Sequence, residues 1–368
     1  GRTEQSMIMT GLRGVGKTVL LNRFAELAEL AGWESIELEA SKHDETAFRQ
    51  SIFSKFRAAL LHISPRRRWS ERARHAAEVL SSFVLSIDQS GTFSVTWDVD
   101  PSEGYGDHGD LGLDLTDVFL AVGDVAKEKE TGIVLLIDEV QFLTTVQLES
   151  LIQAVHKSVQ KKLPITFVGA GLPQIAELAG DAKSYAERLF KFPRIDSLTP
   201  EEARQALVGP AETENVSYDE DAVDLAVSLT HGYPYFIQEL GYQAWIVASG
   251  NHITAEDIST AKEAYEAKLD GSFFRVRLDR ATPLQTAYMR AMAELGSEPQ
   301  KAADVASLMK RESSQVAPIR SQLIDMGLLY TPQHGYAAFT VPDFDKFMMR
   351  AVPRLEVPEI QHRRRRGK

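Results

Sequence analysis

Short apolar runs alternate with helix-period segments along the first 200 residues, and this alternation is the main structural signal of the sequence. The runs at 7–9, 133–137 and 165–168 have the length and composition of strands. The run at 133–137 is continuous, as a central parallel strand buried on both faces requires. Further short strands at 34–38 and 192–195 bring the expected number to five. Strands that alternate with helices predict an α/β domain with a parallel sheet.

The α/β core is expected to carry an insertion at about 83–112. Residues 83–87 and 92–97 alternate between polar and apolar on either side of a turn, which predicts a hairpin. Many Gly and Asp residues follow at 98–112 and predict a surface loop. With this insertion, the core spans 1–198.

Two smaller domains and a tail follow the core. Residues 199–270 have helical periodicity throughout, and they begin with Thr199-Pro200-Glu201-Glu202, the pattern of a capping box. Residues 271–352 have three helical segments before two strands that flank Gln333-His334-Gly335, the order of a winged helix. The three helices are expected at about Pro283–Leu295, Ala302–Met309 and Ser313–Met326. Residues 353–368 form a basic tail that ends in Arg363-Arg364-Arg365-Arg366-Gly367-Lys368.

Composition narrows the class of protein. The chain has 368 residues and 43% hydrophobic residues, enough for two or three domains with cores. The formal net charge of −11 argues against a protein that coats nucleic acid with its whole surface, but it leaves room for a local basic patch. The absence of cysteine excludes disulfides and cysteine-based zinc or thiol chemistry. No apolar run reaches about eighteen residues and no signal peptide is recognisable, so we expect a cytoplasmic protein without a membrane partner.

The segment Gly11-Leu12-Arg13-Gly14-Val15-Gly16-Lys17-Thr18 is the clearest chemical motif. It reads G-x-x-x-x-G-K-T between an expected strand and an expected helix, the context of a phosphate-binding loop. Glycines let backbone N–H groups converge on a phosphate, and the helix N-terminus adds partial positive charge. Lys17 is placed to reach the β- and γ-phosphates, and the Thr18 hydroxyl to ligate Mg²⁺. We expect ATP, since no N-K-x-D motif for guanine is present, and we expect it to be bound by Gly11, Gly14, Val15, Gly16, Lys17, Thr18 and Val19.

A second nucleotide signal is the acidic pair Asp138-Glu139, which ends the apolar run about 120 residues after the loop. Asp138 is placed to hold Mg²⁺ through water, and Glu139 to orient and deprotonate the attacking water. Positioning and charge neutralisation supply most of the catalysis in phosphoryl transfer, so these few groups can suffice. The pair therefore favours a Mg²⁺-dependent ATPase.

With these motifs, the chain resembles the AAA+ ATPases, and within them the branch of the origin-recognition initiators, the STAND signalling ATPases and related archaeal and bacterial ATPases. The resemblance rests on the phosphate loop, on LLIDEVQ at 135–141 and on Thr230–Gln238, and it covers about 5–350. The last segment resembles the G-x-P element, whose proline lies near the adenine. By that likeness, Gly232 and Pro234 sit on lid helices over the base. The alternative is an ordinary helix start with a kinking proline.

The sequence departs from this family in two places. The family has a polar residue at the end of the fourth strand that senses the γ-phosphate, whereas this chain has Val168-Gly169-Ala170-Gly171. The lid motif also offers no arginine for the γ-phosphate. A family-type arginine finger comes just before the fifth strand, where this chain has Arg188, with Arg194 as second choice. Such an arginine is supplied across a subunit interface, and the alternative for Arg188 is a helix-surface salt bridge.

The expected winged helix offers a surface for duplex DNA. Its third helix carries Ser313, Ser314, Gln315 and Arg320, with Lys310 and Arg311 ahead of it and Gln333 and His334 in the wing. The number of basic residues is modest for a strong duplex binder, so an internal packing domain is the alternative. The runs Arg363–Arg366 and Arg66–Arg68, the latter beside Trp69, either contact phosphates or are solvated.

Three functions are consistent with these observations. The first is an ATPase that couples nucleotide state to DNA or partner binding; the second is a nucleotide-gated scaffold with little hydrolysis. The third is a sequence-specific DNA-binding regulator with an ATPase attached. ATP or ADP, duplex DNA and a homo-oligomer are the candidate partners, and Mg²⁺ is the one metal expected, because the histidines lack metal-binding spacing. The sequence begins at Gly1, close to the first expected strand, and we expect a truncated or processed form.

Overall fold

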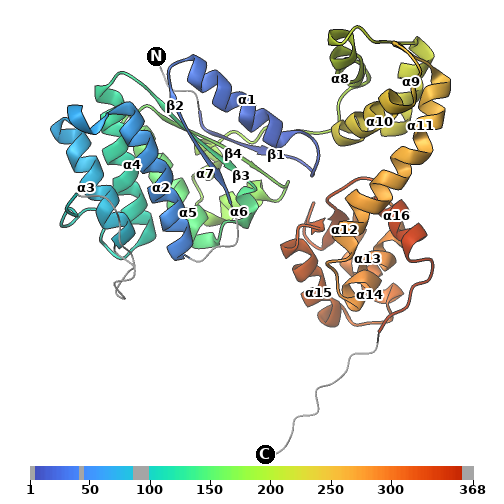
Figure 1. The fold of residues 1–368 in the computed structure, drawn as a ribbon. Coiled ribbons are helices and arrows are strands. Elements are labelled where there is room, and N and C mark those ends of the chain that lie inside the picture. The colour runs from blue at the N-terminus through green and yellow to red at the C-terminus, as the bar shows by residue number, and fades with distance from the viewer. Residues whose placement is uncertain (1–4, 41–44, 86–98, 359–368) are drawn as a thin grey trace, which may run out of the picture. The chain divides into compact units, whose positions relative to one another are not determined.

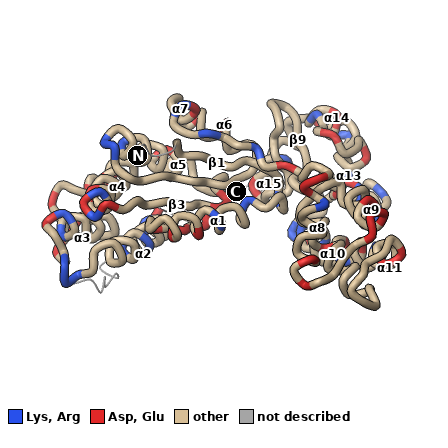
Figure 2. The backbone as a smooth tube through the Cα atoms, turned by 90° about the horizontal axis from the view of Figure 1, so that it is seen from above, with Lys and Arg blue, Asp and Glu red and all other residues tan. Residues whose placement is uncertain are grey.

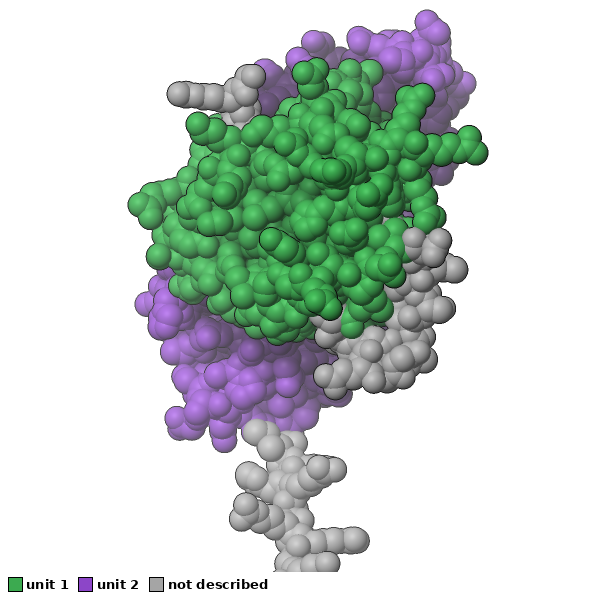
Figure 3. Space-filling view, turned by 90° about the vertical axis from the view of Figure 1, so that its left-hand side faces the viewer, with its two compact units in different colours: residues 1–11, 16–195 green, residues 12–15, 196–368 purple. Residues whose placement is uncertain are grey.

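The computed structural model of the protein describes residues 5–40, 45–85 and 99–358 (Figure 1). By their contacts these residues fall into two compact units, which Figure 3 shows in two colours. The first unit comprises the chain up to Gly11 together with Gly16–Ile195, and the second comprises Leu12–Val15 together with the chain from Asp196 onward. Within the described part, no helix combines the length and the apolar character needed to cross a membrane.

A parallel sheet forms the centre of the first unit and confirms the predicted α/β class. Its strand order is β1-β4-β3-β2, with β1 at Met7–Thr10, β2 at Glu34–Glu39, β3 at Ile133–Asp138 and β4 at Ile165–Gly171. The continuous apolar run of β3 is buried along both faces, and only Asp138 at its end reaches partial exposure. Leu135 and Ile137 belong to one hydrophobic cluster and Val134 and Leu136 to another, as the period of two in a strand requires.

The predicted fifth strand at 192–195 is reduced to two isolated bridges beside β1, made by Lys191 and Arg194. Pro193 lies between them and has no N–H to donate, which interrupts a regular ladder. Its carbonyl still accepts the N–H of Thr10 at 2.9 Å. The segment therefore follows the edge of β1, and the sheet has four strands instead of five within the described residues.

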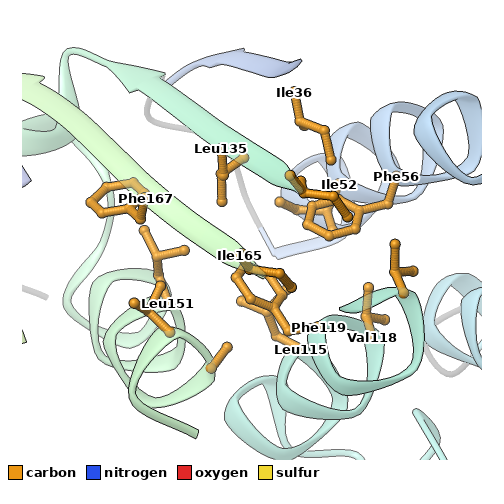
Figure 4. Close-up of a cluster of buried hydrophobic side chains, with 14 of the residues drawn as sticks. Ile36, Ile52, Phe56, Leu115, Val118, Phe119, Leu135, Leu151, Ile165 and Phe167 are labelled. Carbon is orange, nitrogen blue, oxygen red and sulfur yellow. The ribbon is translucent and has the colours of Figure 1, made fainter. Parts of the chain in front are cut away.

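Helices cover both faces of this sheet, with α1 on one face and the larger helical layer on the other (Figure 1). They are α1 Lys17–Leu30, α2 Glu45–Ile63, α3 Glu71–Leu85, α4 Leu111–Glu128, α5 Thr145–Gln160, α6 Ile175–Ala182 and α7 Ala186–Leu189, with 3₁₀ turns η1 at Arg66–Arg68 and η2 at Val140–Phe142. Figure 4 shows the larger core, in which Phe56 of α2 and Phe119 of α4 pack at 5.2 Å between ring centroids. Both rings are fully buried, and burial of such a side chain contributes roughly 1.5–3 kcal/mol. This packing holds the strand ends, and hence the polar residues on them, in fixed positions.

The prediction that a hairpin begins at residue 83 is wrong, because α3 continues to Leu85. Phe83 is fully buried on that helix, and a short apolar run does not distinguish a helix from a strand. The remainder of the predicted hairpin, at 86–98, lies outside the described residues. Residues 99–110 form the expected loop, and the side chain of Asp110 caps the N-terminus of α4.

The first part of the second unit is helical, as predicted, with one short addition. Its helices are α8 Pro200–Thr213, α9 Glu220–Thr230, α10 Pro234–Val247 and α11 Ala255–Lys268, and two residue pairs, β5 Ser217–Tyr218 and β6 His252–Ile253, form a small parallel sheet. The capping box predicted at Thr199 is present on α8. Residues 199–270 contain fourteen Asp and Glu against three Lys and Arg, and the red segments of these helices in Figure 2 reflect this excess. The region is therefore an unfavourable surface for a polyanion.

The last part of the second unit contains the three predicted helices within one residue of their expected ends. They are α13 Pro283–Leu295, α14 Ala302–Leu308 and α15 Ser313–Asp325, and they follow a π-helical turn η3 Leu269–Phe274 and a short helix α12 Arg275–Leu278. The strands β8 Leu329–Tyr330 and β9 Tyr336–Phe339 pair antiparallel, as expected of a hairpin. The structure adds a third strand, β7 Gln300–Lys301, on the other side of β9, and a terminal helix, α16 Phe344–Ala351.

Candidate active site

A hollow of about 360 Å³ lies in the first unit, at the carboxyl ends of β2 and β3 and beside the start of α1. Ligands of parallel α/β sheets bind at the carboxyl ends of the strands. The polar residues that line the hollow are Thr18, Asn22, Glu37, Glu39, Asp138 and Glu139. Sequence reasoning identified Thr18, Asp138 and Glu139 but missed Glu37 and Glu39. The available signal was the alternation of these two acidic residues with Ile36 and Leu38 along the predicted strand.

The phosphate loop has the backbone conformation that its glycines permit. Gly14 has φ +86° and Gly16 has φ +93°, values in the left-handed region that side chains disfavour. No atom lies within 4 Å of a Cβ built on Gly16, so its requirement is conformational and not steric. The Nζ of Lys17, the first residue of α1, donates to the carbonyl of Gly11 at 3.0 Å, and Lys17 is 8% exposed. The ammonium group is thus held over the loop.

The middle of the loop, Leu12–Val15, has its contacts within the second unit. The N–H of Tyr235 donates to the carbonyl of Gly14 at 3.2 Å. A Cβ on Gly14 would lie 3.2 Å from the hydroxyl oxygen of Tyr233, which is closer than most such contacts. Burial raises the pKa of Tyr233, so its hydroxyl stays protonated and able to donate. Glycine is therefore required at position 14 for two reasons, the left-handed φ of its backbone and the close approach of Tyr233.

The two predicted Mg²⁺ ligands meet although they are 120 residues apart. The Oγ1 of Thr18 donates to the Oδ2 of Asp138 at 2.5 Å. The other carboxylate oxygen of Asp138 accepts the N–H of Glu139 at 2.8 Å. Glu139 has φ +53°, a conformation that costs a non-glycine residue about 1–3 kcal/mol and is found at functional sites. The hydrogen bond to Asp138 helps to fix this conformation.

This donor set fits a magnesium ion that is completed by phosphate and water. Magnesium prefers oxygen ligands and uses one or two protein groups together with substrate phosphates. Among the described residues, no three His, Cys, Asp or Glu side chains cluster in a way that could hold a metal ion by themselves. Four carboxylates line the hollow, from Glu37, Glu39, Asp138 and Glu139. They would repel a triphosphate unless a cation lies between them.

Gln141 on η2 is a further residue whose role sequence reasoning missed. Its Nε2 donates to the Oε2 of Glu139, and its Oε1 accepts the N–H of Leu172 at 3.0 Å. Leu172 directly follows β4, the strand whose end has no polar side chain. The sequence signals were the position of Gln141 two residues after Glu139 and the small residues at the end of β4.

Gly232 and Pro234 occupy backbone-defined positions in the second unit. Gly232 has φ +69°, and a Cβ on it would lie 2.3 Å from the carbonyl oxygen of Leu198. The carbonyl of Gly232 accepts the N–H of Leu198 at 2.8 Å. Pro234 is the first residue of α10, a position where its missing N–H costs nothing. Local backbone packing is therefore sufficient to require Gly232, with or without a nucleotide.

Arg188 lies exposed on the short helix α7 of the first unit. Its backbone carbonyl accepts a hydrogen bond from the Gln5 side chain at 3.0 Å. Within the described ranges its guanidinium forms no salt bridge, so the predicted alternative of a helix-surface ion pair is not seen there. The second candidate, Arg194, pairs through its backbone with Thr10 of β1.

Comparison with known proteins supports an ATPase domain in the first part of the chain and the fold described above. Residues 1–168 match the model of the AAA ATPase domain, and residues 271–348 match a domain of unknown function, DUF8462. A search of curated proteins gave no match. A Walker-type ATPase of Pyrococcus abyssi is similar in structure, with a TM-score of 0.56 and 16% identity, over 93% of this chain and 90% of that one.

Two further solved structures align along most of their lengths with lower scores. The RuvB Holliday junction branch migration motor of Thermotoga maritima has a TM-score of 0.47 and 14% identity, over 97% of this chain and 89% of that one. The Orc1 protein of Aeropyrum pernix in complex with DNA has a TM-score of 0.41 and 16% identity, over 95% and 87%. The matched ATPase domain contains the phosphate loop and the acidic end of β3. On this evidence residues 1–168 contain an AAA ATPase domain, and the chain has the fold of a P-loop ATPase.

Proposed function

We propose that the protein hydrolyses ATP in a Mg²⁺-dependent reaction and couples its nucleotide state to binding of duplex DNA or a protein partner. The observation that carries the proposal is the contact between Thr18 and Asp138, which joins the phosphate loop to the acidic end of β3 at 2.5 Å. The ATPase domain match over residues 1–168 supports nucleotide hydrolysis in general. Membership in the origin-recognition and STAND-like branch is part of the proposal and rests on the sequence motifs.

The residues of the loop bind the triphosphate. The N–H groups of Gly14, Val15, Gly16, Thr18 and Val19 and the ammonium of Lys17 surround the β- and γ-phosphates, with Gly11 at the start of the loop. Lys17 releases the carbonyl of Gly11 and donates to phosphate oxygens instead. Thr18, and Asp138 through water, would hold a magnesium ion, which would supply positive charge beside the phosphates.

Glu139 is the general base. Its carboxylate takes a proton from the attacking water, whose oxygen bonds to the γ-phosphorus as the bond between that phosphorus and the ADP oxygen breaks. The products are ADP and phosphate. Arg188 from a second copy of the chain is proposed to stabilise the charge on the transferred phosphoryl group, and its exposure on α7 supports a role at an interface. Gly232 and Pro234 are proposed to approach the adenine base.

The domain at 271–352 is proposed to be a winged helix that contacts DNA. The first turn of α15 carries Ser313, Ser314 and Gln315, all exposed, and the exposed Lys310 lies just before it. Gln333 and His334 are exposed between β8 and β9. The basic tail, including Arg363–Arg366, and the exposed turn Arg66–Arg68 are further candidates for phosphate contacts.

The decisive experiment measures phosphate release by Glu139→Gln with ATP and Mg²⁺. We expect ATP to bind and turnover to fall by about 10²–10⁴-fold, because the amide cannot accept the proton. The control is Glu177→Gln, which makes the same change on the exposed surface of α6 and should turn over normally. Wild-type turnover by Glu139→Gln would rule out Glu139 as the base.

A second function, a nucleotide-gated switch with little hydrolysis, is favoured by one observation. The end of β4 has no polar side chain to sense the γ-phosphate. Phosphate release with and without duplex DNA separates the two functions. Tight ATP binding with negligible release in both conditions would establish the switch.

A further inference from the structure

We infer that Gln141 is a positioning residue for hydrolysis, which orients the carboxylate of Glu139 and links it to the end of β4. This inference rests on the proposed role of Glu139 as the base and deepens it. It assigns a role that neither the phosphate loop nor the acidic pair supplies. The contacts that carry it lie entirely within the first unit.

The first step concerns the turn that presents Gln141. Glu139 is the N-terminal cap residue of η2, and its left-handed φ of +53° reverses the chain directly after β3. The carbonyl of Glu139 accepts the N–H of Phe142 at 2.8 Å, which closes the turn around Gln141. The turn therefore brings the side chain of Gln141 back toward the carboxylate from which it is separated by one residue.

The second step concerns the amide itself, whose two ends make different contacts. The Nε2 donates to the Oε2 of Glu139, and the Oε1 accepts the N–H of Leu172 at 3.0 Å. A carboxylate can only accept and a backbone N–H can only donate, so this orientation of the amide is the one that satisfies both neighbours. Gln141 is thus a bridge between the general base and the chain that follows β4.

The third step concerns Gly171, the last residue of β4. A Cβ on Gly171 would lie 2.8 Å from the Oε1 of Gln141, a separation that real Cβ atoms essentially never show. The glycine at this position therefore leaves room for the amide. Gln141 supplies a polar group at the strand end, which has none of its own.

The chemical consequence follows from the geometry of the carboxylate. A general base must hold an oxygen within hydrogen-bond reach of the proton that it takes. The amide engages one of the two carboxylate oxygens of Glu139 and restricts the rotation of the side chain. Replacing the amide should therefore lower kcat and leave ATP binding unchanged.

The test compares Gln141→Glu and Gln141→Met with the wild type in the full-length chain. Gln141→Glu keeps the shape and an acceptor for Leu172 but puts a carboxylate beside Glu139; Gln141→Met keeps the length and removes both polar contacts. We expect kcat to fall about 10- to 100-fold in both, the range found when a group that orients a reactive ligand is removed. KM for ATP should change less than about twofold, since neither variant alters the phosphate loop. A loss confined to kcat, with KM for ATP unchanged, is the result expected of a residue that positions the base and not of one that binds the nucleotide.

The matched control is Gln160→Glu, the same change at the exposed end of α5, which should leave kcat unchanged. The inference is overturned if both Gln141 variants keep a wild-type kcat. It is also overturned if kcat falls together with the affinity for ATP and with thermal stability, the result of a purely structural role. If Glu139→Gln itself turns over normally, the proposed function fails, and that outcome is distinct from failure at Gln141 alone.

Discussion

The carboxyl end of the sheet and the domain at 271–352 use their polar side chains in different ways. On α15, the N-terminal polar residues are exposed, and a local capping box joins Glu312 to Gln315, three residues further on. At the sheet end, polar residues from segments as far as 120 residues apart bond to one another; they are Thr18, Asp138, Glu139 and Gln141. Polar groups that converge from distant segments indicate chemistry, whereas exposed polar groups with local partners indicate a surface.

The largest expected effect tests the sheet end. Lys17→Ala removes the ammonium group that lies over the phosphate loop, and we expect the affinity for ATP, measured by calorimetry, to fall by about 100-fold or more, since bonds to charged groups contribute strongly. The control is Arg23→Ala on the same helix, whose exposed side chain pairs only locally with Glu26 among the interactions described. Equal affinities of Lys17→Ala and the wild type would show that this convergence of polar groups does not bind phosphate.

The second prediction concerns Gly232 of the second unit and separates its proposed contact with the nucleotide from its observed backbone packing. Gly232→Ala places a Cβ 2.3 Å from the carbonyl oxygen of Leu198 at a φ of +69°. We expect the free energy of unfolding, measured in urea without nucleotide, to fall by about 2 kcal/mol or more. The control is Gly209→Ala on α8, where a Cβ meets no atom within 4 Å and stability should rise by about 0.5–1 kcal/mol. A stable Gly232→Ala that has lost only nucleotide affinity would favour contact with the base over backbone packing.

The third prediction tests whether the basic groups of the C-terminal domain contact DNA. Lys310→Gln with Arg320→Gln should weaken duplex binding by about tenfold and make its salt dependence shallower by about 0.9 for each lost phosphate contact. The control, Lys262→Gln with Lys268→Gln, removes the same number of charges from α11 in the acidic region. Titration of a fluorescent duplex at several salt concentrations measures both. If both double variants lose the same affinity for the duplex, binding depends on the overall charge of the protein and not on Lys310 and Arg320. If the wild type does not bind the duplex at all, the domain at 271–352 serves for packing.

Local patterns predicted the parts of this molecule that depend on nearby residues. The run at 133–137 is continuous and apolar because β3 is buried on both faces, and the phosphate loop is recognisable because its glycines are needed for its own conformation. Helix α13 has the bounds that the sequence predicted, Pro283–Leu295. The motifs predicted that Thr18 and Asp138 both serve a Mg²⁺ site, and the structure adds a direct hydrogen bond between their side chains.

The residues that were mispredicted or missed depend on distant partners. The position of Gln141 two residues after Glu139 is a local signal for its first contact only, because its second contact is the N–H of Leu172, 31 residues away. Pro193 interrupts the predicted fifth strand because it has no N–H to donate, although the residues on either side of it still pair with β1. The periodicity of apolar residues does not reveal that a backbone donor is missing. Phe83 suits a strand or a helix equally well, and its burial on α3 was decided by tertiary packing. Helix α16 was not predicted, because it is short. Its apolar side chains pack against aromatic rings that are distant in sequence, as Phe347 does against Phe274.

The smallest expected effect comes from a polar cluster that converges without lying at the sheet end. The Nε2 of His108 lies 2.9 Å from the Oδ2 of Asp117 on α4, and the N–H of His108 donates to the Oδ1 of Asp114 at 2.8 Å. The hydrogen bond with Asp117 raises the pKa of His108 above its usual 6.5, against a smaller effect of burial, and the charges of Asp117, Asp114 and Asp107 add to the rise. The cluster holds the loop at 99–110 against α4 and is remote in sequence from the phosphate loop.

Because the pKa of His108 is raised in the folded state, the stabilisation is fully present below the unfolded pKa of about 6.5 and is lost as the pH rises through the folded pKa. His108→Gln should therefore lower Tm by about 1–2 °C at a pH of about 5.5, where the pair is charged, and by less at a pH of about 9. In the Asp117→Asn background the same change should show a weaker dependence on pH. ATP turnover should be unchanged in each variant. A loss of ATP turnover would mean that the loop at 99–110 takes part in the reaction. It would contradict the view that the polar groups at the sheet end catalyse while the cluster around His108 only stabilises the fold.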